Sequence, residues 1–270
     1  MGKNAARRGE DVALRPLSAR SVVLSLLLGL HPPELPVREL VRAVEPFGIA
    51  GTTLRAALSR MVAAGDLRRA DAVYALSDRL LERQRRQDDA VHPETRTWAG
   101  DWEMVVVTAT GRDPADRAEL RAELTRLRLA ELREGVWLRP ANLRRPLPDA
   151  LDDVAQRYRS RPEAAARDLA ARLWDLDAWA ATGHALLGHV ARAGDPSARF
   201  TAFAAVVRHL LADPVLPPGL LPDGWPGADL RAAYARYRRE LAGEVRARGD
   251  GHLREAARAR TGQDADSGAE

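Results

Sequence analysis

Hydroxyl and guanidinium side chains recur at helical spacing between Phe47 and Leu67. They are Thr52, Thr53, Arg55, Ser59 and Arg60. Hydroxyl groups can bond phosphate oxygens or base edges, and arginine can bond phosphate or the O6 and N7 atoms of guanine. These residue types therefore suit contact with nucleic acid. A solvated helix face in an interaction domain has the same composition, so the surrounding elements must decide between the two.

The opposite side of this segment is apolar. Its members fall at i, i+4, i+7 and i+8, and they are Leu54, Leu58, Met61 and Val62. This period predicts an amphipathic helix over 52–64 whose apolar side is buried. The run Gly51-Thr52-Thr53 opens the helix with hydroxyl capping candidates, and Gly65 ends it.

Two further helices and a hairpin are predicted around this helix. The first helix covers Leu17–Leu30, and the segment HPPELP follows as a stiff connector. A second helix has Pro36 in its first turn and ends before Pro46. After Gly65, short strands are expected at Leu67–Arg69 and Val73–Leu76. Three helices followed by a hairpin predict a winged helix-turn-helix, in which Arg68 and Arg69 could hold phosphates.

The positive charge of the chain lies near this segment. The chain has 270 residues and is 46% hydrophobic, which is enough for two or three domains, and its net charge is +4. Residues 1–90 hold 15 basic and 11 acidic side chains, whereas residues 91–270 hold 27 of each. A positive excess beside the polar helix favours a nucleic-acid partner.

Signatures of catalysis and metal binding are missing from the sequence. The chain has no cysteine, which excludes disulfides and cysteine-based zinc sites. His184 and His189 are five residues apart and do not share a helix face as i, i+4 ligands would. Asp101 could serve as a nuclease ligand, although a turn residue is the simpler interpretation. We therefore expect no enzymatic activity, no metal and no cofactor.

The apolar run Ser21–Leu30 resembles the core of a signal peptide. It follows Arg15 and Arg20, but it is too short to span a membrane, and no small-residue cleavage site follows it. We expect a buried first helix, no membrane partner and a cytoplasmic location.

The remainder of the chain predicts two further domains. Residues 78–91 form a charged linker helix, so the first domain covers 17–91. A strand at Trp102–Thr108, a helix from Asp113 to Leu129 and a strand at Gly135–Pro140 predict an α/β middle domain over 98–162. Residues 148–162 are expected to add a helix and a strand around Arg157–Arg159.

Helices dominate the C-terminal domain expected over 163–249. A long amphipathic helix or a broken pair of helices begins after Glu163, and another helix covers Ser197–Ala212. The proline-rich segment Asp213–Gly227 must be a loop that packs down. A last helix is expected from Asp229 to Arg248, followed by a disordered tail over 250–270. The six tryptophans are expected in cores, or lining a ligand pocket.

Several segments together resemble the PaaX family, the repressors of phenylacetate-degradation operons and their relatives. The matching segments are RSVVLSLLLGL, EPFGIAGTTLRAALSRMVAAGDL, YALSDRL, WAGDWEMVVVT, GVWLRPANL, ARLWDLDAW and DPVLPPGLLPDGWPG. They span about Ser18 to Leu241 in the order of the family. The family's recognition-helix pattern maps onto Leu54–Met61.

The resemblance implies an α+β protein with three parts. These are an N-terminal winged helix-turn-helix, a ferredoxin-like middle domain similar to small CRISPR-associated nucleases, and a helical C-terminal domain. It further implies a homodimeric regulator, usually a repressor, that binds a double-stranded DNA operator. In well-known members phenylacetyl-CoA releases the protein from DNA, so phenylacetyl-CoA or another acyl-CoA is the implied effector.

The sequence departs from the family pattern at two places. Members commonly have Gly-Trp-Leu where this chain has Gly65-Asp66-Leu67, and their wing carries a longer tip.

Two other functions fit the residues as well. One is a metal-dependent nuclease built on the middle domain, and the other is a protein-interaction module that uses the winged helix for docking.

Overall fold

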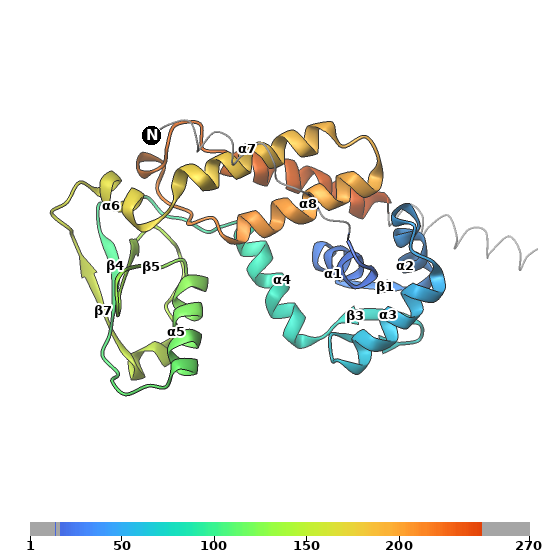
Figure 1. The fold of residues 1–270 in the computed structure, drawn as a ribbon, viewed down its shortest axis with the longest axis horizontal. Coiled ribbons are helices and arrows are strands. Elements are labelled where there is room, and N and C mark those ends of the chain that lie inside the picture. Colours follow the sequence, from blue (N-terminus) through green and yellow to red (C-terminus); the bar gives the residue numbers. More distant parts are fainter. Residues whose placement is uncertain (1–13, 15–16, 245–270) are drawn as a thin grey trace, which may run out of the picture. The chain divides into compact units, whose positions relative to one another are not determined.

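The computed structural model describes residue 14 and residues 17–244 (Figure 1). It combines helices with two antiparallel sheets, which confirms the α+β class. The described chain divides into two compact units. The N-terminal unit holds residues 17–85, 195–203 and 232–244, and the central unit holds residues 14, 86–194 and 204–231. The division into domains 17–91, 98–162 and 163–249 stays a prediction.

Three helices form the core of the N-terminal unit. They are α1 (Ala19–Gly29), α2 (Val37–Val44) and α3 (Gly51–Ala63). Ser18 caps α1 by accepting a hydrogen bond from the Ser21 amide at 3.2 Å. Most of α1 is buried among the other elements of this unit, as Figure 1 shows. The predicted buried first helix is therefore confirmed, with the capping serine just before it.

A three-stranded sheet completes this unit. Strands β1 (Glu34–Pro36), β3 (Val73–Leu76) and β2 (Leu67–Ala70) lie in that order and pair antiparallel. The hairpin of β2 and β3 was predicted, but β1 was not, because the proline-rich segment HPPELP that contains it was predicted to be a stiff connector. Leu35 is buried opposite Tyr74 in this strand. Since β1 is an edge strand, it tolerates the proline that ends it.

The turn between β2 and β3 has only two residues. Asp71 and Ala72 adopt φ values of 45° and 62°, the left-handed geometry that suits a tight hairpin. The carbonyl of Ala72 accepts a hydrogen bond from the amide of Val37 at 2.9 Å. The turn is thereby fastened to the start of α2.

Helix α4 (Asp78–Val91) follows the hairpin and contributes residues to both units. Its Gln84 side chain is buried and donates to the carbonyls of Leu27, Leu28 and Leu30 at 3.4, 3.2 and 2.8 Å. Carbonyls at the end of a helix have no intrahelical partner. Gln84 therefore satisfies the C-terminus of α1.

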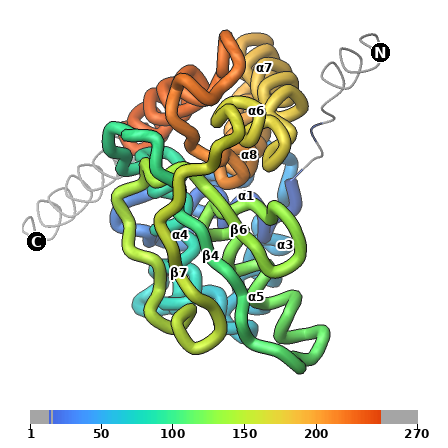
Figure 2. Tube along the Cα trace, turned by 90° about the vertical axis from the view of Figure 1, so that its left-hand side faces the viewer, coloured from blue at the N-terminus to red at the C-terminus, as the bar shows by residue number. Residues whose placement is uncertain are grey.

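The central unit contains a four-stranded antiparallel sheet. Its order is β5 (Ala130–Arg133), β6 (Val136–Pro140), β4 (Trp102–Val107) and β7 (Ala155–Ser160), and Figure 2 shows β6, β4 and β7 side by side. Helix α5 (Pro114–Arg126) packs on one face, where Val105, Leu124 and Trp137 share a core. The short 3-10 helix η3 (Asp149–Asp153) precedes β7 where a helix was predicted.

The helix of the middle region ends earlier than predicted. Asp113 caps α5 through the Asp116 amide, as the Asp-Pro start indicates. The chain leaves the helix after Arg126, and Arg128 adopts a φ of 60°. Residues 130–133 then form β5, which the sequence did not predict. The left-handed Arg128 is the local reason for the early end, because this conformation cannot continue a helix.

Helices make up the rest of the central unit. The segment after Glu163 is a broken pair, α6 (Ala166–Leu173) and α7 (Leu176–Arg192), and Asp175 caps α7 through the Ala178 amide at 3.1 Å. Helix α8 (Pro196–Leu211) contributes residues to both units. The following loop contains η4 (Pro218–Leu220) and buries Val215 and Leu216, so the predicted packing of this loop is confirmed.

The last described helix covers residues 227–244, two residues ahead of its predicted start. Its predicted end at Arg248 and the predicted disordered tail over 250–270 lie outside the described residues.

Trp102 is buried in a core, whereas Trp179 is stacked between His209 and Trp225 at ring separations of 4.1 and 4.3 Å. Among the described residues, no helix is both long enough and apolar enough to cross a membrane.

Candidate nucleic-acid interface

The outer face of α3 presents every polar side chain predicted for it. The exposed members are Thr52, Thr53, Arg55, Ser59 and Arg60. Leu54, Leu58 and Met61 are buried on the inner side, as predicted. Val62 was predicted to be buried, but it is 36% exposed, and Ala57 takes the fourth buried position. Val62 lies at the border of the apolar stripe, where the three-helix core no longer covers it.

The start of α3 corrects the predicted capping. Ala50 occupies the N-cap position and no side chain caps the helix. Gly51 is the first helical residue, so Thr52 and Thr53 lie inside the first turn with their hydroxyls exposed. The first amides of a helix lack intrahelical acceptors and carry partial positive charge. This end of α3 therefore combines free amide donors with two hydroxyls, which suits a phosphate.

The outer face of α3 is not engaged by the rest of the described chain. Within residues 17–244, the side chains of Thr52–Arg60 that point outward make no hydrogen bond and no ion pair. Hydroxyl and guanidinium groups that stay in water keep their hydrogen-bonding capacity at no desolvation cost. This face is therefore available to an external partner.

Unlike the arginines of α3, Arg68 and Arg69 of the hairpin contact other side chains. Arg68 Nη1 lies 3.1 Å from Asp78 Oδ1, and the guanidinium of Arg69 lies 5.8 Å from the centre of the Tyr74 ring. Both arginines are exposed. Exposed ion pairs contribute little to stability, so both could exchange these contacts for phosphate.

A buried carboxylate, whose role was not predicted from the sequence, braces this surface. Asp66 is only 2% exposed and pairs with Arg20 at 2.7 Å and with Arg79. Its amide donates to the Met61 carbonyl and its carbonyl accepts from the Ser77 amide. Asp66 thus ties α1, the end of α3 and the start of α4 together. The available signal was an acidic residue between the glycine that ends a helix and a strand.

The nuclease alternative depends on Asp101. Its Oδ1 lies 2.5 Å from Nε of Arg161, and its carbonyl accepts from the Trp98 indole and the Ala141 amide. In the part of the chain that the structure describes, no three histidine, aspartate or glutamate side chains converge to hold a metal ion. The converging carboxylates that a metal-dependent nuclease needs are not found there.

Comparison with known proteins places these features in a class. Three family models match the chain: "PaaX-like protein" over residues 18–80, "PaaX protein central Cas2-like domain" over 95–165 and "PaaX-like protein C-terminal domain" over 174–254. Such proteins are transcriptional regulators rather than enzymes. The three matches together cover most of the chain in the order of the family, and the chain belongs to the PaaX family.

A solved structure is similar to this one. It is titled "Uncharacterized protein Rv0674 from Mycobacterium tuberculosis", is 52% identical in sequence and superposes with a TM-score of 0.75. The similarity covers 85% of this chain and 98% of that chain. None of the curated proteins compared matches the sequence.

Proposed function

We propose that this protein is a sequence-specific DNA-binding repressor whose N-terminal unit is a winged helix-turn-helix. The main support is the outer face of α3, whose polar side chains are exposed and make no hydrogen bond or ion pair with other described residues. Helices α1–α3 followed by β2 and β3 support the proposed domain type. The order β5-β6-β4-β7 supports a ferredoxin-like middle domain.

In this proposal, α3 enters the major groove of a double-stranded operator. Thr52, Thr53, Arg55, Ser59 and Arg60 would contact bases and phosphates, and Arg68 and Arg69 would hold phosphates beside them. A homodimer would place two copies of α3 on half-sites separated by one or more helical turns of about 10 base pairs. The Asp66 brace would keep α3 and the hairpin in one fixed geometry, which reduces the entropy lost on binding.

A small metabolite would release the protein from DNA in the cytoplasm. Phenylacetyl-CoA or another acyl-CoA is the proposed effector, and it would favour a dimer geometry that no longer matches the groove spacing. A pocket of about 360 Å³ lies in the central unit, with Trp174 and Leu220 among its apolar walls. Asp175, Asp177 and Asp223 outnumber Arg167 around it. It suits an apolar group better than the phosphates of a coenzyme.

The test is DNA binding to the protein's own upstream region. Arg55→Ala and Arg60→Ala should each weaken binding by about 1–3 kcal/mol in a gel-shift titration. Arg133→Ala is the matched control, because Arg133 is an exposed arginine on β5 of the central unit. Circular dichroism should show unchanged folding in all three variants.

The alternatives predict different results. If both α3 variants bind as tightly as the control, the interface assignment is wrong. Affinity that is independent of salt concentration would favour a protein-interaction module, since phosphate contacts make DNA binding salt-dependent. Cleavage of DNA upon addition of magnesium or manganese would favour the nuclease.

A further inference from the structure

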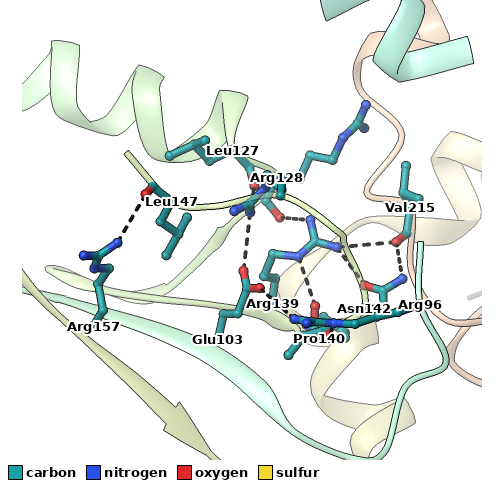
Figure 3. A network of polar contacts seen from close by, with 12 residues as sticks. Arg96, Glu103, Leu127, Arg128, Arg139, Pro140, Asn142, Leu147, Arg157 and Val215 are labelled. Carbon is teal, nitrogen blue, oxygen red and sulfur yellow. Dashed lines mark hydrogen bonds and ion pairs between the residues drawn. The ribbon is translucent and has the colours of Figure 1, made fainter. Parts of the chain in front are cut away.

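Arginine side chains gather in the central unit around the end of β6. This arginine cluster comprises Arg96, Arg128, Arg139, Arg145 and Arg231. Two buried carboxylates, Glu103 and Asp213, lie among them. Figure 3 shows Arg139 at the centre of the hydrogen bonds, with Glu103 and Arg96 beside it. The proposed interface does not use any of these residues.

Arg139 is fully buried and bonded only to neutral groups. Its Nε donates to the Pro140 carbonyl at 3.0 Å and its Nη1 to the Arg128 carbonyl at 3.3 Å. Its Nη2 donates to Asn142 Oδ1 at 2.9 Å and to the Val215 carbonyl at 3.4 Å. Burial, reinforced by the charge of Arg145, lowers the pKa of Arg139 to about 9. The charged form of Arg139 is therefore less favourable here than in water, mainly because the guanidinium is buried.

Arg145 has donors without acceptors. Its Nη2 bonds Glu103 at 3.4 Å and the Leu127 carbonyl. Its Nε and Nη1 are shielded from solvent and meet no acceptor in the described part of the chain. Buried donors nearly always have partners, and an unpaired one carries the full cost of its desolvation. Unpaired donors on a charged guanidinium indicate that an acceptor from outside the chain completes the site.

The charge balance indicates what that acceptor is. Asp213 is paired with Arg231 at 2.7 Å, while Glu103 is shared between Arg145 and Arg96, the latter at 3.9 Å. The exposed Asp89 acts weakly on Arg128. Five positive side chains thus face three negative ones. A phosphoryl group supplies about −1.5 to −2 charges and three strong acceptor oxygens at pH 7, whereas a carboxylate supplies one charge.

We propose that the arginine cluster binds the phosphoryl group of a metabolite, with Arg145 as its main donor. Arg128 and Arg139 surround the group with positive charge, and Asn142 holds Arg139 in place. As an effector site this inference rests on the proposed function, because the ligand counts as an effector only if it changes DNA binding. The binding itself is independent of DNA and is measured without it.

The experiment is isothermal titration of the full chain with inorganic pyrophosphate at constant ionic strength. We expect saturable binding by the wild type and binding weaker by about tenfold or more in Arg145→Gln. Arg144→Gln is the matched control, because Arg144 is the adjacent arginine, is exposed, and donates from its side chain to the Thr95 carbonyl at 3.1 Å. The control should bind like the wild type.

Two further ligands distinguish the sources of the anion, and a second variant tests the site if the first fails to fold. Adenosine diphosphate that binds more tightly than pyrophosphate identifies a larger metabolite, and acetate should bind far more weakly. Arg145→Lys keeps the charge with fewer donors and should bind with intermediate affinity, which tests the site if Arg145→Gln fails to fold. Absence of pyrophosphate binding, equal losses in the Arg144 and Arg145 variants, or acetate binding as tight as pyrophosphate would each overturn the proposal.

A gel shift with and without pyrophosphate or adenosine diphosphate is run separately. Loss of DNA binding in Arg55→Ala together with retained pyrophosphate binding supports both proposals. If the protein binds pyrophosphate but no DNA, the regulator assignment fails while the phosphoryl site stands.

Discussion

Arginine occupies two opposite environments in this molecule. On the outer face of α3, Arg55 and Arg60 are exposed, and their guanidinium groups make no hydrogen bond or ion pair with another described residue. In the arginine cluster, Arg139 is fully buried and Arg145 is mostly buried. Both donate to backbone carbonyls, and Arg145 also pairs with Glu103. The first pair keeps its hydration until a partner arrives. The second pair has lost its hydration during folding. Arg139 is compensated by acceptors within the protein, whereas two donors of Arg145 meet no acceptor among the described residues.

The difference shows how one side chain serves two purposes. An exposed guanidinium adds little to stability and can contribute its whole interaction to a ligand. A buried guanidinium fixes the surrounding loops through its five donors, and its removal leaves several carbonyls unpaired. Variants of Arg55 and Arg60 should therefore change binding, and variants of Arg139 should change folding. Four measurements test this contrast.

The largest effect is expected for Arg139→Met. Methionine fills similar volume but donates no hydrogen bond, so the Arg128 and Pro140 carbonyls and Asn142 Oδ1 lose a donor, whereas the Val215 carbonyl keeps the one from Asn142. The free energy of unfolding should therefore fall by about 3 kcal/mol or more. Urea denaturation followed by circular dichroism measures the change. Arg133→Met, at an exposed site, should unfold like the wild type. A stable Arg139→Met protein would show that the buried guanidinium is dispensable for folding.

A smaller loss of stability is expected for Asp66→Asn. This change keeps the shape but removes the charge that Arg20 and Arg79 share, and both arginines are more than half exposed. Because solvent screens those pairs, the free energy of unfolding should fall by about 1–2 kcal/mol. Thermal unfolding is the measurement, and Asp71→Asn at the exposed hairpin turn is the control. Equal melting temperatures in both variants would contradict the bracing role.

The salt dependence of DNA binding can separate the two arginines of α3. A side chain that contacts a phosphate should lower the slope of log affinity against log salt concentration by about 1 when it is removed. A side chain that contacts a guanine edge should weaken binding without changing the slope. Gel shifts of Arg55→Ala and Arg60→Ala at several salt concentrations provide the slopes. An unchanged slope together with unchanged affinity would argue against contact by that residue.

The smallest effect is expected from pH. Burial lowers the pKa of His209 below its ordinary value of 6.5, partly offset by its bond to the Trp179 carbonyl and by Asp213. As pH falls below 6.5, the unfolded chain takes up the proton more readily than the folded chain, so stability should decrease. In His209→Gln, the melting temperature should change less between pH 7 and pH 5 than in the wild type. His184→Gln, at an exposed site, should show the same change as the wild type. Parallel curves for His209→Gln and wild type would contradict this assignment.

The local signals in the sequence predicted much of the fold. The polar and apolar faces of α3, the Asp113 cap and the hairpin strands all follow from period and residue type. Strand β1 was missed because its prolines indicate a connector, and only pairing with β3 makes it a strand. The exposure of the five polar side chains of α3 matches the prediction, but their contact with DNA stays a prediction.

The buried charges could not be predicted. The position of Asp66 between Gly65 and a strand marks it in the sequence, but its burial depends on Arg20 and Arg79, which lie 46 and 13 residues away. The arginine cluster likewise joins Arg128, Arg139 and Asp213, which come from separate segments. Local periodicity carries no information on contacts between distant segments, so such sites need the folded chain.

The two-residue turn at Asp71 and Ala72 has an evolutionary consequence. Because β3 is held between β1 and β2, the register of the hairpin does not depend on the length of its tip. Insertions at exposed tips cost little free energy. Duplicated genes could thus acquire new target preferences by lengthening this tip alone, with the core inherited unchanged.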